Sequence, residues 1–414
     1  MSDIMVEKPT SGAQRDADPA AGEPAAPGWR EWRPSVVQGF LTWLAAMITY
    51  ALVTLVAWLP PAGDPPDPGA VYAQWNKWDV AWYTIISDLG YTWDERSPAF
   101  FPLYPMLVRL VNPVVPGLSF PAALTVSSAA GLAVMILMHR LTTVHFGEEL
   151  ARRAIFYVIA WPTAFLLVNA YNESLLIALA LGALYLMHRG RWGWAAVVVA
   201  FAGSARASGI LLVAPFLWEY LRQHGYSWRS PGRSLRGVRP DLLWILLTPT
   251  GLVVYMAYLW HAFGDPLIFR TAQDAWWRHP RPPWTGMMLG ADLLTEHWPS
   301  VEPNAVRNII NMLTVVLALT LMLAATVGPW RLRGDGIYLV VASAAMFALP
   351  LCTPMENGYS PLDSLWRYVL EAPVVFMMLA RLGRGFFFDR AFIMVALAMQ
   401  GVMIVVFLHE QFVG

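Results

Sequence analysis

The sequence predicts an all-α polytopic membrane protein, and three observations lead to this fold class. Of the 414 residues, 57% are hydrophobic and only 14% are charged, whereas soluble proteins average roughly 45–50% and about 25%. The mean hydropathy is correspondingly high, at +0.47. Long apolar stretches recur along the chain, and the first of them, Val36 to Leu59, is long enough to cross a hydrocarbon core of roughly 30 Å as a helix.

The composition also excludes several other classes of protein. Basic and acidic residues are equal in number, at 28 each, so no basic surface is available for nucleic acid. Cys352 is the only cysteine, which excludes an intramolecular disulfide and a cysteine-based metal cluster. The histidines show no paired ligand spacing, and the sequence has no glycine-rich phosphate motif. We therefore expect neither a metal nor another cofactor.

The N-terminal region, residues 1–34, is expected to be a disordered cytoplasmic tail. Pro, Ala, Gly and charged residues dominate it, and they supply too little apolar surface for a core. Residues 35–414 are expected to form a single multi-helix membrane domain. Because the first span lies far from the N-terminus and lacks a small-residue cleavage site, we expect a retained anchor rather than a signal peptide.

About eleven transmembrane or re-entrant helices are predicted in this domain. The apolar stretches that predict them are Val36 to Leu59, Ala122 to Met138, Ala154 to Ala170, Leu175 to Met187, Trp194 to Leu221, Leu242 to Trp260, Ile309 to Val327, Ile337 to Leu351, Leu365 to Leu379 and Phe392 to Leu408. The stretch with Arg206 near its middle is too long for one span, so we expect two short helices in a hairpin. The hairpin also keeps most arginines on the cytoplasmic side, with the N-terminus inside and the C-terminus outside.

This topology leaves two large non-cytoplasmic loops, residues 60–120 and 261–308. Both loops are rich in tryptophan, which favours the level of the lipid headgroups. No internal repeat is visible in the sequence, which disfavours the duplicated architecture of many secondary transporters. The loops are therefore the expected place for chemistry.

The first loop is expected to contain an interfacial helix over residues 71–89. Its apolar positions recur at steps of three and four and form one helical stripe: Val71, Trp75, Trp78, Trp82, Ile85 and Leu89. The opposite face holds Asp79 and Tyr83. A helix of this kind lies flat on the membrane and holds the aspartate among the headgroups. The alternative is a plain amphipathic surface helix with a solvated aspartate.

Four segments, in order along the chain, resemble a known family. They are WDVAWYTIISDLGY with the following AFFPLYPML, then WPTAFLLVNAYNESLL, SARASGILL and, more weakly, LWRYVLEAPVVF. Together they resemble the PIG-V-like family (GPI mannosyltransferase 2-like), which belongs to the GT-C class of polytopic glycosyltransferases. Asn172 and the two residues after Arg206 depart from the family's pattern. The scarcity of lysine, with only Lys8 and Lys77, suggests a high-GC bacterium of actinobacterial type and a place in its cytoplasmic membrane.

The resemblance implies transfer of a mannosyl residue from a polyprenyl-phosphate-mannose donor to a lipid-linked acceptor, such as a glycolipid, on the non-cytoplasmic face. Asp79 matches the family's acidic residue and would act as the general base. Arg206 and Arg367 would stabilise the charge that develops on the departing phosphate. The other expected substrate-binding residues are Trp78, Tyr83, Tyr171, Asn172 and Glu173.

Several alternatives remain open at this point. Arg206 at membrane depth needs a partner, which is either a phosphate or a structural group such as Glu173. Arg367 has Glu371 four residues later, which predicts an ordinary ion pair along one helix. Asp88, Asp94 and Glu95 are expected to be surface charges, and Asp88 is the candidate among them for a second carboxylate at the site. The sequence also permits another lipid-linked donor sugar, arabinose or galactose, or a transporter of lipid-linked saccharides, and it does not determine the acceptor, the isoprenoid length or the oligomeric state.

Overall fold

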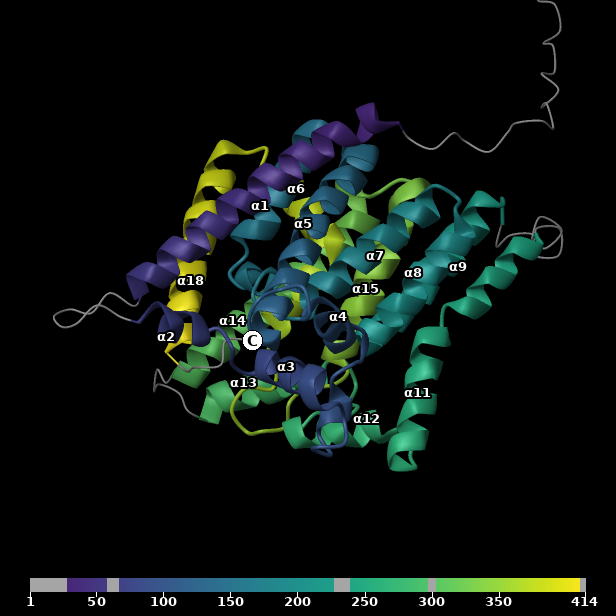
Figure 1. Ribbon diagram of the computed structural model, residues 1–414. Helices are drawn as coiled ribbons and strands as arrows, with labels where there is room; N and C mark the ends of the chain where they lie inside the picture. Colours follow the sequence, from purple (N-terminus) through teal and green to yellow (C-terminus); the bar gives the residue numbers. More distant parts are fainter. Residues whose placement is uncertain (1–27, 58–66, 227–238, 297–302, 410–414) are drawn as a thin grey trace, which may run out of the picture.

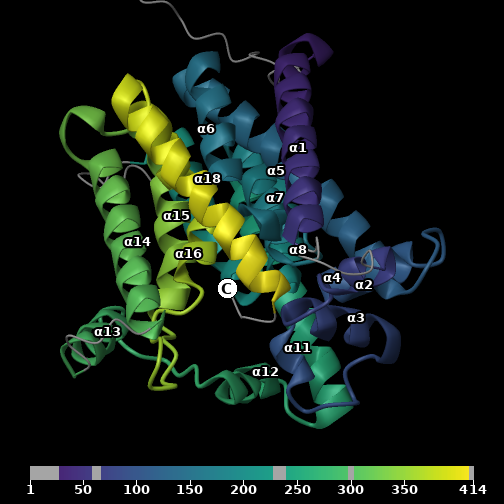
Figure 2. The same ribbon diagram turned by 90° about the vertical axis from the view of Figure 1, so that its left-hand side faces the viewer.

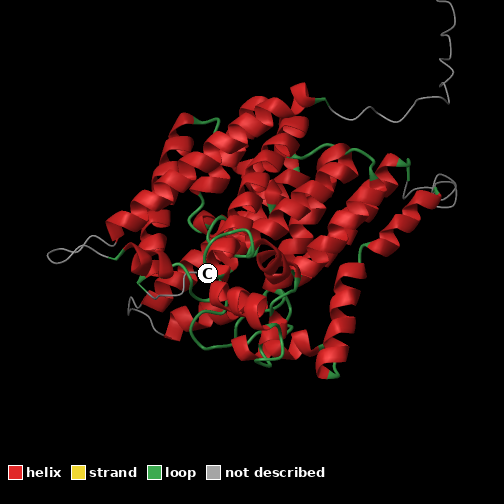
Figure 3. Ribbon diagram, in the orientation of Figure 1, coloured by secondary structure: helices red, strands yellow, loops and turns green. Residues whose placement is uncertain are grey.

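The computed structural model describes residues 28–57, 67–226, 239–296 and 303–409. Throughout these ranges the chain forms helices and loops, with one isolated bridge between Arg278 and Met355 and no strand (Figure 3). The prediction of an all-α fold is confirmed.

Among the described residues, six helical stretches are long and apolar enough to cross a membrane. They are α1 (Trp29–Ala57), α5 (Ser119–Phe146), η5 (Pro240–Leu247) with α11 (Thr250–Phe263), α14 (Pro303–Thr326), α15 (Ile337–Leu351) with the residues just before it, and α18 (Phe386–Leu408). Shorter helices fill the centre of the bundle between them: α6 (Glu148–Ala160), α7 (Glu173–His188), α8 (Trp192–Ala205), α9 (Val213–Gln223) and α17 (Pro373–Leu382). Every apolar stretch predicted from the sequence coincides with one or more of these helices.

The predicted boundary of the N-terminal tail lies inside α1. Residues 1–27 are outside the described residues, but the helix begins at Trp29 rather than after residue 34. Its first turn is fixed to α5, because Arg140 donates to the Glu31 carboxylate at 2.6 Å and to the Glu31 carbonyl oxygen at 3.0 Å. Residues 29–34 therefore belong to the helical bundle and not to the predicted tail.

Two of the predicted helices are shorter or more broken than expected, and proline explains both. Helix α6 ends at Ala160, ten residues before the predicted Ala170, and Trp161 is extended because Pro162 follows it. The stretch expected as one helix from Leu365 consists of α16 (Leu365–Tyr368), η9 (Val369–Glu371) and then α17 from Pro373. Pro373 supplies no N–H group to a continuing helix.

The hairpin predicted around Arg206 is confirmed. Helices α8 and α9 are joined by η3 (Ala207–Leu212), and the end of α9 returns to the start of α8, where the rings of Trp192 and Tyr220 lie 4.9 Å apart. At the turn the chain comes so close to itself that a Cβ on Gly209 would lie 2.1 Å from the Ala202 carbonyl oxygen. Only glycine permits this approach, and Arg206 sits at the turn with an extended backbone.

The two predicted external loops lie at the same end of the bundle (Figures 1 and 2). Short helices form most of both loops: α2 (Pro68–Ala73), α3 (Asp79–Leu89) and α4 (Leu103–Val111) in the first, and α12 (Ile268–Thr271) and α13 (Thr285–Glu296) in the second. The last turn of α18 lies at this end, and the first turn of α1 lies at the opposite end (Figure 2). The side of the membrane that each end faces stays a prediction.

The single interfacial helix predicted over residues 71–89 is wrong. Helix α2 ends at Ala73, the chain turns through residues 74–78, and α3 begins at Asp79. Trp78 has a φ of 56°, which a bulky residue adopts only under constraint. One such constraint lies next to it, since the Lys77 ammonium donates to the Leu408 carbonyl oxygen at 3.1 Å and ties the turn to the end of α18.

The packed face of α3 also differs from the predicted one. Tyr83, expected on the polar face, is buried against Phe100 and Tyr104, with ring centroids 5.2 and 4.8 Å away. Leu89, expected on the buried apolar stripe, is 66% exposed. The helix packs against α4 and α5. In this orientation Asp79 faces the space between the two loops.

Candidate active site

A cavity of about 1180 Å³ lies between the two loops at this end of the bundle. It is lined by α3 and the residues after it, by the turn at Arg206, by residues 265–280 of the second loop, by the start of α14, and by residues 349–371. A volume of this size accommodates a sugar with its phosphate and part of an acceptor.

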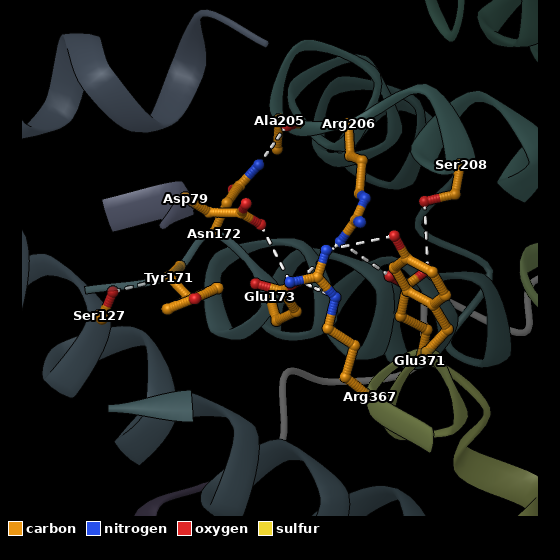
Figure 4. Close-up of polar contacts among 11 residues, drawn as sticks. Asp79, Ser127, Tyr171, Asn172, Glu173, Ala205, Arg206, Ser208, Arg367 and Glu371 are labelled. Carbon is orange, nitrogen blue, oxygen red and sulfur yellow. Dashed lines mark hydrogen bonds and ion pairs between the residues drawn. The ribbon is translucent and has the colours of Figure 1, made fainter. Parts of the chain in front are cut away.

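Charged side chains from four distant segments meet on one side of the cavity, in what we name the ion-pair network: Asp79, Glu173, Arg206, Arg367 and Glu371 (Figure 4). Arg367 Nη1 lies 2.9 Å from Asp79 Oδ2, and Arg367 Nε lies 3.5 Å from Glu173 Oε1. Arg206 Nη1 lies 3.0 Å from the same Glu173 oxygen and 3.2 Å from Glu371 Oε1. Each arginine thus faces two carboxylates.

The backbone around the network is held by hydrogen bonds from neighbouring helices. On one side, the carbonyl of Trp366, just before Arg367, accepts from Trp161 Nε1 at 2.7 Å and from the Thr163 hydroxyl at 3.2 Å. On the other, the Tyr171 carbonyl, two residues before Glu173, accepts from the Ser127 hydroxyl at 2.8 Å. These contacts fix the segments on which the charges stand.

Polar and aromatic neighbours complete the network. The side-chain amide of Asn172 donates to the Ala205 carbonyl oxygen next to Arg206, and the Ser208 hydroxyl donates to Glu371 Oε2 at 3.2 Å. The guanidinium carbons of Arg206 and Arg367 lie 4.7 and 5.1 Å from the centre of the Tyr368 ring. Such cation–π contacts stabilise guanidinium groups that are largely removed from water.

Burial differs among the members of the network. The side chains of Glu173 and Glu371 are 2% exposed, whereas those of Arg206 and Asp79 are 23% and 20% exposed. Buried charges persist only when they are paired and hydrogen-bonded, which is the case for both glutamates. Asp79 and Arg206 are therefore the members that a ligand in the cavity would meet.

The structure brings together all the site residues predicted from the sequence. Those that line the cavity are Trp78, Asp79, Tyr83, Asn172, Arg206 and Arg367. Behind this lining, Glu173 pairs with both arginines, and the Tyr171 ring lies 5.8 Å from the Arg367 guanidinium. Their catalytic and binding roles stay predictions.

Of the structural readings given for these residues, two are confirmed and one is wrong. Arg206 does pair with Glu173. Glu371 pairs with Arg206 rather than with Arg367, because the break into α16 and η9 removes the regular helical spacing. Asp88 accepts a hydrogen bond from the Ser119 hydroxyl and lies on an exposed position outside the cavity lining, as expected for a surface charge.

Comparison with known sequences tests the resemblance directly. The model of the mannosyltransferase (PIG-V) family matches residues 69–262. The resemblance to PIG-V mannosyltransferases is confirmed. The range contains Asp79, Glu173 and Arg206, but it ends before Arg367 and Glu371.

Relatives of known name or structure match more distantly. GPI mannosyltransferase 2 of Yarrowia lipolytica is 32% identical over 98 residues, which is 23% of this chain and 28% of that protein. The oligosaccharyltransferase of Archaeoglobus fulgidus, tethered to an acceptor peptide or in the apo form, gives TM-scores of 0.42 and 0.44 at 12% and 11% identity. These matches cover 90% of this chain and 55% and 56% of the solved chains, so the protein spans about half their length.

A second polar group, outside the PIG-V match, lines the cavity; we name it the Arg278 wall and define it as Arg278, Ser360, Asp363 and Ser364. Arg278 Nη1 donates to the Thr353 carbonyl oxygen at 3.0 Å, and Nη2 donates to that of Asp363 at 3.3 Å. Burial raises the pKa of the Asp363 carboxyl, against the opposing effect of nearby Arg307, Arg278 and Arg367.

Sequence analysis missed the Arg278 wall, and it also missed Tyr368 and Ser208. Single polar residues in loops show no periodicity, and their spacing predicts no shared site. Tyr368 had the clearest signal, since it directly follows Arg367 in the fourth segment of the resemblance. Among the described residues, no group of three His, Cys, Asp or Glu side chains is arranged to hold a metal ion.

Proposed function

We propose that this protein is a membrane glycosyltransferase of GT-C type that transfers a mannosyl residue from polyprenyl-phosphate-mannose to a lipid-linked acceptor. The observation that supports this most directly is the state of Asp79 in a cavity within a PIG-V-like chain. One carboxylate oxygen, Oδ2, faces Arg367 at 2.9 Å, and the other has no hydrogen-bond partner among the described residues. A carboxylate oriented by one oxygen and open at the other suits a general base.

The proposed reaction is a single displacement with inversion. An acceptor hydroxyl oxygen attacks the anomeric carbon from the side opposite the phosphate, and the bond between that carbon and the phosphate oxygen breaks. The electron pair leaves with polyprenyl phosphate, and the hydroxyl proton passes to Asp79. The products are the mannosylated acceptor and polyprenyl phosphate, so atoms and charge balance without a metal or another cofactor.

In this proposal the rest of the ion-pair network positions the base. Arg367 holds the Asp79 carboxylate in one orientation, and Glu173 holds Arg367 and Arg206 together. Because these contacts exist before a substrate arrives, little reorganisation is needed during the reaction. Replacing Glu173 would therefore disturb catalysis through Arg367 rather than through the substrate.

Aromatic rings on the cavity lining support a saccharide-bearing substrate. Trp82 stacks on Phe100 with ring centroids 5.2 Å apart and planes at 11°, and Trp276 from the second loop meets Trp82 edge-on at 5.7 Å. All three rings line the cavity. Their flat apolar surfaces match the C–H faces of pyranose rings, so a glycolipid acceptor is part of the proposal.

The location of the site supports lipid-linked substrates. The cavity lies at one end of a bundle with six apolar helices that are long enough to cross a membrane, close to where headgroups would be. A sugar carried on a polyprenyl phosphate reaches this depth without leaving the bilayer. The non-cytoplasmic face of a bacterial cytoplasmic membrane is the location we propose for the reaction.

The decisive experiment uses purified full-length protein in liposomes with radiolabelled polyprenyl-phosphate-mannose and a membrane lipid extract from the source cells. Wild type is compared with Asp79→Asn and with the matched control Asp88→Asn, which changes an exposed carboxylate of the same helix. We expect a labelled glycolipid from wild type and Asp88→Asn and none from Asp79→Asn. Equal labelling by all three would exclude Asp79 as the base.

Two further outcomes would replace the proposed reaction. Labelling from polyprenyl-phosphate-arabinose or a galactose donor, but not from the mannose donor, would retain the enzyme class and change the sugar. Movement of intact labelled donor across the bilayer, without a new glycolipid, would identify a transporter.

A further inference from the structure

We propose that the phosphate of the lipid-linked donor binds at the Arg278 wall rather than at Arg206 and Arg367. The inference rests on the proposed function, because it concerns where that donor is held. It assigns a binding role to Arg278, Ser360 and Ser364, three residues that lie outside the PIG-V-like match.

The ion-pair network is poorly suited to a phosphate. Its two guanidinium groups already face three carboxylates, and within the described residues Arg206 and Arg367 form their ion pairs with these carboxylates. The group therefore has a formal excess of one negative charge. A phosphate placed there would meet like charges at short range, which is unfavourable in a partly dehydrated cavity.

Arg278, unlike Arg206 and Arg367, is not neutralised by a described carboxylate. Its guanidinium is fixed by two backbone carbonyl oxygens, those of Thr353 and Asp363, and no described carboxylate lies within ion-pair distance of it. A guanidinium has five N–H donors, and these two contacts use two of them. Arg278 therefore presents an oriented positive charge with further donors on the cavity lining, and bidentate arginine contacts are common in phosphate recognition.

Two serines in the Arg278 wall add unpaired hydrogen-bond donors. The hydroxyl groups of Ser360 and Ser364 are buried, line the cavity, and have no hydrogen-bond partner among the described residues. Buried polar groups are normally paired, so these two hydroxyl groups are available to donate to a ligand in the cavity. Phosphate oxygens accept hydrogen bonds from hydroxyl and guanidinium groups alike.

The backbone of Ser364 supports the same conclusion. Its φ is 72°, which is unfavourable for any residue other than glycine, and its carbonyl oxygen accepts from the amides of Arg367 and Tyr368 at 3.1 and 3.2 Å. Backbone strain of this kind is concentrated at functional sites. Here the strained residue lies three positions before the arginine that orients Asp79.

The wall and the network are close enough to serve one substrate. Tyr368 lies between them, because its ring centre is 5.1 Å from the Arg367 guanidinium and 5.9 Å from that of Arg278. A mannosyl group could therefore have its phosphate on the wall and its anomeric carbon near Asp79. Asp363 is the one carboxyl group in the wall, and its backbone carbonyl oxygen, not its carboxylate, is the group that accepts from Arg278.

The test measures direct binding of a short-chain polyprenyl phosphate, the reaction product, to full-length protein in phosphatidylcholine nanodiscs. We expect Arg278→Gln to weaken binding by about tenfold or more, the double variant Ser360→Ala with Ser364→Ala to weaken it several-fold, and Arg278→Lys to restore part of the loss. Arg281→Gln is the matched control, since Arg281 is three residues away but pairs with Glu356 at 2.5 Å outside the cavity lining. Unphosphorylated polyprenol should bind equally weakly to all variants.

The outcomes separate this inference from the proposed function. If wild type does not distinguish polyprenyl phosphate from polyprenol, the lipid-phosphate donor itself is wrong. If it does distinguish them but Arg278→Gln and the serine variant bind as Arg281→Gln does, only the Arg278 wall is overturned. Competition by phosphatidylglycerol in the nanodisc, or by inorganic phosphate at equal concentration, would assign the wall to a phospholipid or to free phosphate and would also overturn the inference.

Discussion

The two polar groups on the cavity differ in how completely they are satisfied. In the ion-pair network, Glu173 and Glu371 are buried and each meets an arginine at 3.0–3.2 Å. In the Arg278 wall, a guanidinium is held only by carbonyl oxygens and two buried hydroxyl groups have no partner among the described residues. One group is complete in the absence of substrate, and the other has unused donors.

Under our proposals, the ion-pair network is preorganised before the substrate arrives, and the Arg278 wall has donors that are available to a ligand. A satisfied network of charges keeps its geometry between turnovers, and removing Arg206 would leave the buried Glu371 carboxylate without an ion-pair partner. An unsatisfied group costs stability until something binds to it. We therefore expect changes in the network to affect stability or chemistry, and changes in the wall to affect donor binding.

The largest effect is expected for Asp79→Asn. The amide cannot accept the acceptor's proton, so we expect the turnover rate to fall by about 10²- to 10⁴-fold, while the affinity for polyprenyl phosphate changes little. Turnover is measured as labelled glycolipid formed at saturating donor, and affinity is measured in nanodiscs. A large loss of affinity with unchanged turnover would remove the distinction between the two groups.

Glu173→Gln should have the next largest effect, on stability. Its carboxylate lies 3.0 Å from Arg206 Nη1 and 3.5 Å from Arg367 Nε, and it is almost fully buried. Loss of this charge leaves Arg206 with Glu371 alone and Arg367 with Asp79 alone. Each guanidinium therefore keeps one carboxylate, and we expect the lost buried contacts to lower the free energy of unfolding by about 1–3 kcal/mol. Titration with denaturant in mixed micelles gives this quantity.

A matched control is available for that measurement. Glu149 pairs with Arg153 at 3.5 Å along one helix, and its side chain is 70% exposed. Because exposed ion pairs contribute little, Glu149→Gln should leave the unfolding midpoint almost unchanged. A comparable decrease in the free energy of unfolding in both variants would show that the ion-pair network stabilises the fold no more than an exposed ion pair does.

The sequence predicted the helices better than it predicted their contacts. Apolar length and loop arginines predicted the six long apolar helices and the hairpin at Arg206, since these features are local. The pairing of Asp79 with Arg367, 288 residues apart, has no local signal. The turn at Trp78 was missed because a tryptophan periodicity of three and four is satisfied equally by a helix that stops and restarts.

The pH dependence of stability gives a smaller effect, from Asp363 in the Arg278 wall. Burial raises the pKa of its carboxyl above the value in the unfolded chain, so the folded state holds this proton more tightly. The protonated carboxyl is therefore tolerated at low pH, and stability is lost as pH rises from the unfolded pKa through the folded one. We expect Asp363→Asn to unfold at a higher temperature than wild type at pH 7, by an amount that shrinks toward acidic pH.

Thermal unfolding between about pH 3 and 8 measures this difference. Arg278, Arg307 and Arg367 act against the shift, so the substitution has to be compared at constant ionic strength. A variant that is less stable than wild type at pH 7 would mean that these arginines depend on the Asp363 charge. In that case the wall would be a second satisfied network rather than a ligand site.

The smallest effect is expected from the exposed ion pair of Arg281 and Glu356. This pair lies next to the Arg278 wall but outside the cavity lining, so it tests which residues belong to the wall. The guanidinium lowers the pKa of Glu356, so the pair adds stability above the unfolded pKa of the carboxyl and loses it as pH falls through the folded one. Because water and salt screen exposed charges, Glu356→Gln should shift the unfolding temperature only slightly at neutral pH and low salt, and not at all at high salt. Polyprenyl phosphate binding should be unchanged in the same variant. If binding instead strengthened, the released Arg281 would be attracting the phosphate from outside the cavity. The donor would then be selected by the charge of the whole second loop rather than by the fixed geometry of Arg278, Ser360 and Ser364.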